Sequence, residues 1–143
     1  MITRASVDIS VMSQVRFCCV LIGTDCITHC INLFSGNEAT LNFYLNNFTD
    51  VWSLEAAIRN IRYIGGNTNT TGGLWLMRTE IFNQANGDRQ EVENVAILIT
   101  DGNPTREVDK LDDEVRLIKA SRIRILGVGV TNAVSFFSVC SLI

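Results

Sequence analysis

The fold is decided by a run of five apolar residues, Val95-Ala96-Ile97-Leu98-Ile99, which leads into Thr100-Asp101-Gly102. Continuous rather than alternating apolar residues predict a strand that is covered on both faces, as in the middle of a parallel sheet. A second apolar run, IRILGVGV at 123–130, predicts another buried strand. The segment between them has apolar residues at helical spacing, namely Val108, Leu111, Val115 and Ile118. Strand, helix and strand in this order indicate an α/β fold.

Upstream of this unit the sequence predicts a hairpin. Residues 27–34 and 39–45 are typical of strands, and a short polar turn, Ser35-Gly36-Asn37-Glu38, lies between them. The second strand alternates apolar with polar residues, which indicates a half-buried edge. We therefore expect a doubly wound, mostly parallel sheet with an antiparallel edge hairpin.

Two more helices are expected between the hairpin and the central strand. The first is capped by Asp50 or Ser53 and runs to about Tyr63. The second begins near Leu74, after the polar loop GGNTNTTGG at 65–73. In the third helix, at 108–118, the acidic run Asp112-Asp113-Glu114 lies off the apolar face, and we expect it to be solvated.

Length, charge and hydropathy exclude several classes of protein. The 143 residues correspond to one domain, and 47% hydrophobic residues suffice for a core. A net charge of −3 provides no basic surface for nucleic acid. The apolar run at 17–23 is far shorter than the roughly 20 residues that span a membrane, and it is marginal as a signal peptide. We expect no nucleic-acid partner and no membrane span.

The cysteines are unevenly distributed. Four of the five, Cys18, Cys19, Cys26 and Cys30, lie in the first 36 residues, and Cys140 lies near the end. Cys26, His29 and Cys30, with Cys18 and Cys19 upstream, are possible zinc ligands, but their spacing matches no four-ligand framework, so incidental thiols are favoured. His29 is the only histidine, and no nucleophile motif accompanies it. The sequence therefore predicts no enzyme.

Oxygen ligands are the more specific chemical feature. Asp101 follows the central strand, and the 65–73 loop supplies the hydroxyls of Thr68, Thr70 and Thr71. In open α/β sheets both positions fall near the carboxyl ends of strands, where ligands bind. This oxygen set suits Mg²⁺, Mn²⁺ or Ca²⁺ better than zinc. The alternatives are an ordinary capping loop and a turn-forming aspartate; a phosphate site is disfavoured because no G-K-[ST] or G-x-G-x-x-G motif is present.

Much of the chain resembles a known family. The segments are FSGNEATLNFYLNNFTD (34–50), LEAAIRNIRYIGGNTNTTGGL (54–74), EIFNQANGDR (80–89), NVAILITDGNPTREVDKLDDEV (94–115) and IRILGVGVTN (123–132). They resemble a von Willebrand factor A (VWA) domain, most closely those of matrilins and of type VI and fibril-associated collagens. The resemblance covers residues 31–133, in the family's order of motifs. It implies the Rossmann-like VWA fold.

The resemblance also implies a function and a metal site. Such domains are extracellular, non-catalytic adhesion modules that bind protein partners such as collagens. A metal-ion-dependent adhesion site holds the divalent cation, and a partner carboxylate completes the metal's shell. Thr68 and Asp101 correspond to two of the site's ligands, which implies Mg²⁺ or Mn²⁺.

The chain departs from the family pattern at both ends. The family's Asp-x-Ser-x-Ser motif has only one look-alike, Asp8-Ile9-Ser10-Val11-Met12, with methionine in place of the second serine. We therefore expect a partial domain that lacks a normal first strand and last helix, with an incomplete metal site. Residues 1–30 form an atypical cysteine-rich segment, and 134–143 an atypical apolar tail. A fragment of this kind would be poorly stable, because the neighbours of the missing strand would have unpaired backbone groups.

Two other readings of the function stay open. One is a metal-independent structural or assembly module, or a non-functional fragment. The other is an intracellular VWA protein, since thiols suit a reducing compartment. For a secreted chain, Asn47-Phe48-Thr49 is a glycosylation sequon at a surface turn, so Asn47 is a candidate site. A second sequon at Asn69 lies inside the expected metal loop, and we expect it to be unused.

Overall fold

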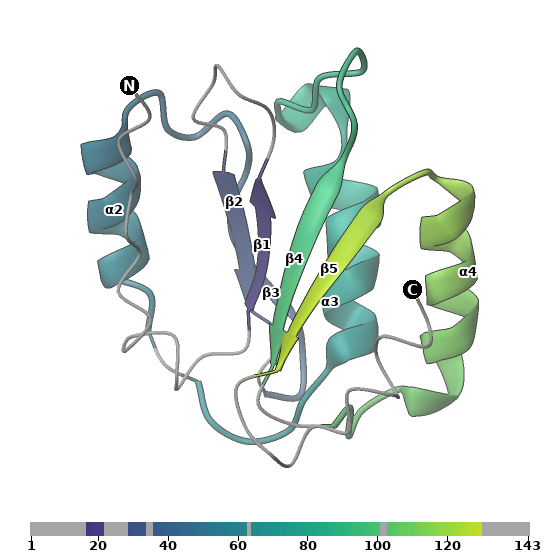
Figure 1. Ribbon diagram of the computed structural model, residues 1–143. Helices are drawn as coiled ribbons and strands as arrows, with labels where there is room; N and C mark the ends of the chain where they lie inside the picture. The colour runs from purple at the N-terminus through teal and green to yellow at the C-terminus, as the bar shows by residue number, and fades with distance from the viewer. Residues whose placement is uncertain (1–16, 22–28, 34–35, 63, 101–102, 130–143) are drawn as a thin grey trace.

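The computed structural model describes residues 17–21, 29–33, 36–62, 64–100 and 103–129. A five-stranded sheet with strand order β3-β2-β1-β4-β5 forms the middle layer (Figure 1). The strands are β1 (Phe17–Leu21), β2 (His29–Leu33), β3 (Thr40–Phe43), β4 (Val95–Thr100) and β5 (Arg124–Gly129). The predicted hairpin is confirmed, because β2 and β3 pair antiparallel at one edge of the sheet.

The strand directions combine parallel and antiparallel neighbours. β4 and β5 pair in parallel, whereas β1 pairs antiparallel with both β2 and β4. Consequently β2, β4 and β5 point the same way, as predicted for a mostly parallel α/β sheet. Among the described strands, however, only β4 and β5 are parallel neighbours, because β1 runs in the opposite direction between β2 and β4.

The strand at the centre of the sheet corrects one expectation. We expected β2 and β4 to lack a neighbour between them, but the apolar run that begins at Phe17 occupies that place as β1. Phe17 lies opposite Leu33 of β2 on one side and opposite Ile99 of β4 on the other. The backbone groups of both neighbours are therefore paired, and the expected cost of unpaired groups does not arise there. The centre of the sheet is therefore filled by β1, which runs antiparallel to both of its neighbours.

Helices flank the sheet on both sides (Figure 1). They are α2 (Val51–Arg59), α3 (Thr70–Leu76), which continues as the π-helical turn Met77–Ile81, and α4 (Leu111–Ala120), with single 3₁₀ turns at Gln84–Asn86 and Val108–Lys110. α2 lies on one side, and α3 and α4 lie on the other. The doubly wound α/β prediction is confirmed. None of the helices in the described residues is long and apolar enough to cross a membrane.

Helix boundaries differ from the predicted ones for local reasons. Asp50, not Ser53, caps α2, because its carboxylate accepts from the Ser53 backbone N–H at 2.9 Å; α2 ends at Arg59 rather than near Tyr63. α3 starts at Thr70, inside the polar loop, because the side chain of Asn69 caps it.

Two apolar clusters fix the helices to the sheet. On the α2 side, Phe43 of β3 and Leu54 of α2 form a small cluster with partly buried neighbours. On the other side a larger cluster joins β4 and β5 to α3 and α4; its members include Leu74, Met77, Ala96, Leu98, Leu111, Val115, Ile118 and Ile125. β4 therefore has apolar contacts on both faces, as its continuous apolar run predicts.

The third predicted helix needs two corrections. Val108 is 52% exposed, because it lies in the 3₁₀ turn before α4 and not on the apolar face. Glu114, predicted to be solvated, is only 6% exposed, and it pairs with Arg78. Its carboxylate can be buried because the guanidinium supplies two hydrogen bonds, which offset the loss of water.

Candidate functional site

Thr68 lies where the loop before α3 meets the connection that follows β4. It is 1% exposed, which makes it one of the most buried polar residues described. Its backbone N–H donates to the Thr105 hydroxyl at 2.8 Å, and its carbonyl accepts from the N–H groups of Thr105 at 2.9 Å and Arg106 at 3.2 Å. None of these hydrogen bonds uses the Thr68 hydroxyl. The backbone of Thr68 is therefore fixed by the connection that follows β4.

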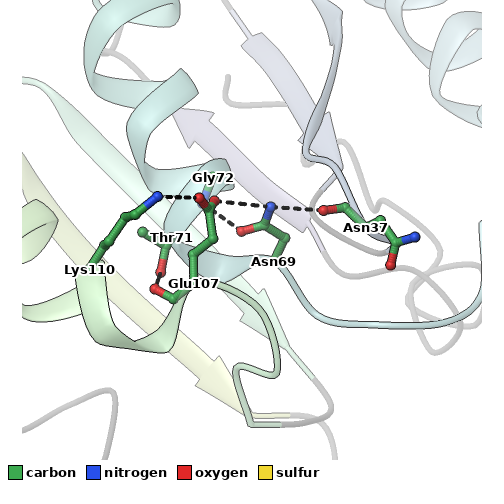
Figure 2. Close-up of polar contacts among 6 residues, drawn as sticks. All are labelled: Asn37, Asn69, Thr71, Gly72, Glu107 and Lys110. Atoms are coloured by element: carbon green, nitrogen blue, oxygen red, sulfur yellow. Dashed lines mark hydrogen bonds and ion pairs between the residues drawn. The ribbon is translucent and has the colours of Figure 1, made fainter.

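The neighbouring Asn69 joins three loops (Figure 2). Its side-chain oxygen accepts from Gly72 N–H at 2.9 Å and caps α3. Its amide nitrogen donates to the carbonyl of Asn37 at 3.1 Å and reaches the carboxylate of Glu107 at 3.5 Å. Asn69 is 5% exposed, so these contacts replace the water that its amide would otherwise bind.

A glycine at position 72 is required by this capping arrangement. A Cβ atom there would lie 2.9 Å from Asn69 Nδ2 and 3.0 Å from Oδ1, closer than side chains pack. The hydroxyl of the adjacent Thr71 donates to the backbone carbonyl of Glu107 at 2.9 Å. The first turn of α3 is thus held both by its own cap and by the connection after β4.

Glu107 holds this connection in an uncommon conformation. Its φ of 48° is left-handed, which is rare for a residue other than glycine. In that conformation its carbonyl reaches Thr71 while its carboxylate faces Asn69 and accepts from Lys110 at 2.7 Å. The hydrogen bond and charge of Lys110 lower the pKa of Glu107, so the carboxylate stays ionised at neutral pH.

A groove of about 350 Å³ borders this network. Trp75 of α3, which is 48% exposed, lines it together with Arg106 and Glu38. The surface beside Thr68 therefore offers a tryptophan and an arginine, two residue types that are enriched at protein-binding surfaces.

The predicted site residues have different outcomes. Thr68 lies in the loop before α3 and is bonded to the connection that follows β4, and its role as a metal ligand stays a prediction; Asp101 lies outside the described residues. The same holds for Asp8 and Ser10. The hydroxyl of Thr71 donates a hydrogen bond to the backbone carbonyl of Glu107 instead of facing an open site. In the part of the chain that the structure describes, no three His, Cys, Asp or Glu residues cluster as metal ligands.

The Thr68 hydroxyl is an oxygen in the loop that is bonded to the connection after β4, at the edge of the sheet where α/β folds bind ligands. Oxygen donors suit Mg²⁺ and Mn²⁺. Of the candidate zinc ligands, Cys18 and Cys19 lie in β1, His29 and Cys30 lie in β2, and Cys26 lies outside the described residues.

The glycosylation sequons differ in accessibility. Asn47 is exposed in the turn after β3, where its side-chain oxygen accepts from Tyr44 N–H at 2.6 Å. β3 runs opposite to β4, so this turn lies at the other end of the sheet from Thr68. Asn69 is buried, and its amide nitrogen is engaged. Asn47 is the more accessible of the two.

Sequence reasoning missed three residues of this network. Asn69 had a recognisable signal, since asparagine is a preferred residue at the N-cap of a helix. Thr105 and Glu107 had none, because their partners Thr68 and Thr71 lie more than thirty residues away along the chain.

Comparisons with known sequences identify the family. A family model, the von Willebrand factor type A domain, matches residues 11–136. The collagen alpha-1(XX) chain of Homo sapiens is 33% identical over 112 residues, which are 78% of this chain and 8% of the collagen. Vitrin of Homo sapiens is 31% identical over 98 residues, 68% of this chain and 14% of vitrin. The chain thus spans a small part of the length of these relatives.

Solved structures show the same fold. Proximal thread matrix protein 1 from the mussel byssus matches with a TM-score of 0.66 at 24% identity, covering 71% of this chain and 26% of that one. A further structure of that mussel protein, with zinc in its metal-ion-dependent adhesion site motif, matches with a TM-score of 0.63 at 25% identity, covering 68% and 25%.

Proposed function

Because the chain belongs to the von Willebrand factor type A family, we propose that it is a non-catalytic protein-binding module of an extracellular matrix or adhesion protein. Its partners are matrix proteins such as collagens. An acidic side chain of the partner binds through a divalent cation, Mg²⁺ or Mn²⁺, held by Thr68 and Asp101. The relatives support the extracellular assignment, since they are collagen chains and vitrin.

The observation that carries this proposal is the state of Thr68. Its backbone N–H and carbonyl are both engaged by the connection that follows β4, and none of these hydrogen bonds uses its hydroxyl. A bound cation would supply a positive charge that attracts a carboxylate from the partner. The role of this chain is to hold the oxygen ligands and to offer the surface around them, including Trp75 and Arg106.

A binding assay on immobilised collagen tests the proposal. The protein is applied in Mg²⁺, in Mn²⁺, in Zn²⁺ or in EDTA; zinc is included because the mussel relative holds it. We expect retention with Mg²⁺ or Mn²⁺ and release by EDTA, and we expect Thr68→Val to lose retention while keeping its thermal stability. A metal-mediated role would be contradicted if the unaltered protein were retained equally in EDTA and in Mg²⁺, and if Thr68→Val were retained as well as the unaltered protein.

A second function is favoured by a different surface. On β5, Leu126 is 50% exposed and Val128 is 45% exposed. Apolar side chains on a sheet strand suit contacts with another protein, without a metal. A metal-independent assembly role would appear as self-association that persists in EDTA and is removed by Leu126→Lys, measured by analytical ultracentrifugation.

A further inference from the structure

The groove beside α3 is walled by three segments that are far apart in the sequence. Glu38 lies in the turn before β3, Trp75 lies in α3, and Arg106 lies in the connection after β4. The side chain of Asn69 holds the three segments together, because it hydrogen-bonds to the turn and to the connection and also caps α3 (Figure 2). The walls are therefore fixed before a ligand binds, which lowers the entropic cost of binding.

Two opposite charges that line the groove have no ionic partner in the part of the chain that the structure describes. The Glu38 carboxylate and the Arg106 guanidinium are both exposed, and neither makes an ion pair or a side-chain hydrogen bond there, with the other or with a third residue. Glu107, the remaining charged residue of the lining, already accepts from Lys110 at 2.7 Å. Lys110 is also the main cause of the lowered pKa of Glu107, to which the charge of Arg106 contributes least. Glu38 and Arg106 are thus the charges that a ligand can pair with.

The ring of Trp75 supplies an apolar surface in the same groove. The side chain is 48% exposed, and among the described residues the ring makes no aromatic or cation contact. Tryptophan is the aromatic side chain that attracts ammonium and guanidinium groups most strongly. A basic side chain that pairs with Glu38 can therefore lay its apolar stem along this ring while its charge is satisfied.

We propose that the groove binds a short segment of a partner protein that carries a basic and an acidic side chain near each other. The basic side chain pairs with Glu38 and contacts Trp75, and the acidic side chain pairs with Arg106. A volume of about 350 Å³ lies near the lower end of the roughly 300–1,000 Å³ typical of ligand pockets, so the groove accommodates a few side chains.

The two charges favour this occupant over simpler ones. An apolar segment would remove water from Glu38 and Arg106 without replacing it, which costs free energy. A segment with charges of one sign would leave one of the two unpaired and would be repelled by it. The contacts involve no metal ion, so this inference goes beyond the cation-mediated function and does not depend on it.

An NMR titration in EDTA tests the proposal with a defined probe. The probe is a short capped glycine peptide with one arginine and one glutamate two positions apart, used in both orders, and the control peptide has glutamine at both positions. The chain has two tryptophans, so Trp75 reports on the groove, and Trp52 of α2, on the opposite side of the sheet, is the internal reference (Figure 1). We expect a saturable shift of the Trp75 indole N–H signal with at least one order of the charged peptide. The glutamine peptide should leave this signal unchanged, and the Trp52 signal should not move with any peptide.

Variants of the two charged residues identify the contacts. Glu38→Gln and Arg106→Gln should each weaken binding of the charged peptide by about 1.5- to 5-fold, the range expected for an exposed ion pair. Glu38→Lys should weaken it further, because it repels the arginine of the peptide. Glu91→Gln, which changes an exposed carboxylate in the segment that leads into β4, is the matched control and should bind as the unaltered protein does.

Several results would overturn the proposal. They are the absence of a saturable Trp75 shift with either order of the charged peptide, an equal shift with the glutamine peptide, and an equal shift of the Trp52 signal. Unchanged affinity in both Glu38→Gln and Arg106→Gln would overturn it as well. Because the titration is done in EDTA, its failure is separate from a failure of the cation-mediated function, which the Mn²⁺ and collagen assays test.

Discussion

The ion pair between Arg78 and Glu114 joins the π-helical turn to α4. Arg78 Nε donates to Glu114 Oε1 at 2.6 Å, and Arg78 Nη2 donates to Oε2 at 3.0 Å, so the contact is bidentate. The side chain of Glu114 is 7% exposed and that of Arg78 is 20% exposed. The hydrogen bonds to Glu114 raise the pKa of Arg78, so the guanidinium stays charged. Replacing either residue leaves a largely buried charge without its partner.

The expected cost follows from this degree of burial. Removing one partner of a fully buried pair costs about 3–5 kcal/mol, whereas an exposed pair contributes about 0–1 kcal/mol. This pair is not fully buried, because the side chain of Arg78 is 20% exposed. We therefore expect Arg78→Ala to lower the free energy of unfolding by about 2–3 kcal/mol, less than for a fully buried pair. Glu114→Ala should cost less, since the long side chain of Arg78 can turn its charge outward.

Urea unfolding followed by circular dichroism measures both changes. With a slope of about 1–3 kcal/mol per molar urea, the loss for Arg78→Ala shifts the midpoint by roughly 1 M. Arg59→Ala is the matched control, because Arg59 pairs with Glu55 on α2 with side chains 61% and 45% exposed. If Arg78→Ala shifts the midpoint no more than Arg59→Ala does, the reasoning from burial is refuted.

Three further predictions concern other parts of the fold. The hydrogen bonds from Ser53 lower the pKa of Asp50 below its ordinary value of 3.8, so its contribution to stability is present above that pH and is lost as the pH falls through the lower folded value. Asp50→Asn should keep the α2 cap and lose this acid dependence, and Asp50→Ala should lose both, in melting curves recorded from pH 2 to 7 (chosen as roughly spanning the titration of carboxylates). Secretion from mammalian cells should give a glycan at Asn47 that Asn47→Gln abolishes, and mass spectrometry that finds the glycan at Asn69 instead would count against the buried placement of that residue. Gly87→Ala should lower the melting temperature more than Gly66→Ala; both glycines have positive φ, but a Cβ at 87 meets the backbone 2.8 Å away, whereas at 66 the nearest atom is 4.0 Å away.

Local patterns predicted the helices and the buried strand well. The continuous apolar run of β4 and the helical spacing of Leu111, Val115 and Ile118 both report burial directly, and burial is what the structure shows. The same helical spacing also indicated that Glu114 lies on the buried face, but its charge favoured a solvated position. Glu114 lies three residues after Leu111 and one before Val115, so it shares their face of α4, and its partner Arg78 lies 36 residues away.

Features that depend on distant partners were not predictable. The apolar run from Phe17 to Leu21 is long enough for a strand, but its place between β2 and β4 and its direction depend on pairing with residues up to about eighty positions away. The bond between Thr68 and Thr105 likewise spans 37 positions. Sequence reasoning identified Thr68 as a ligand candidate from its loop; it had no means to identify the residue that holds it.

Calorimetric titration of the unaltered protein with Mn²⁺, beside Thr68→Val and Asp101→Ala, tests the central claim most directly. Valine has nearly the shape of threonine and lacks the hydroxyl, so the variant removes one proposed ligand with little change in packing. We predict a saturable binding heat for the unaltered protein that both variants lose while they remain folded. Absence of heat in the unaltered protein, or equal heat in all three, would contradict a cation site formed by Thr68 and Asp101.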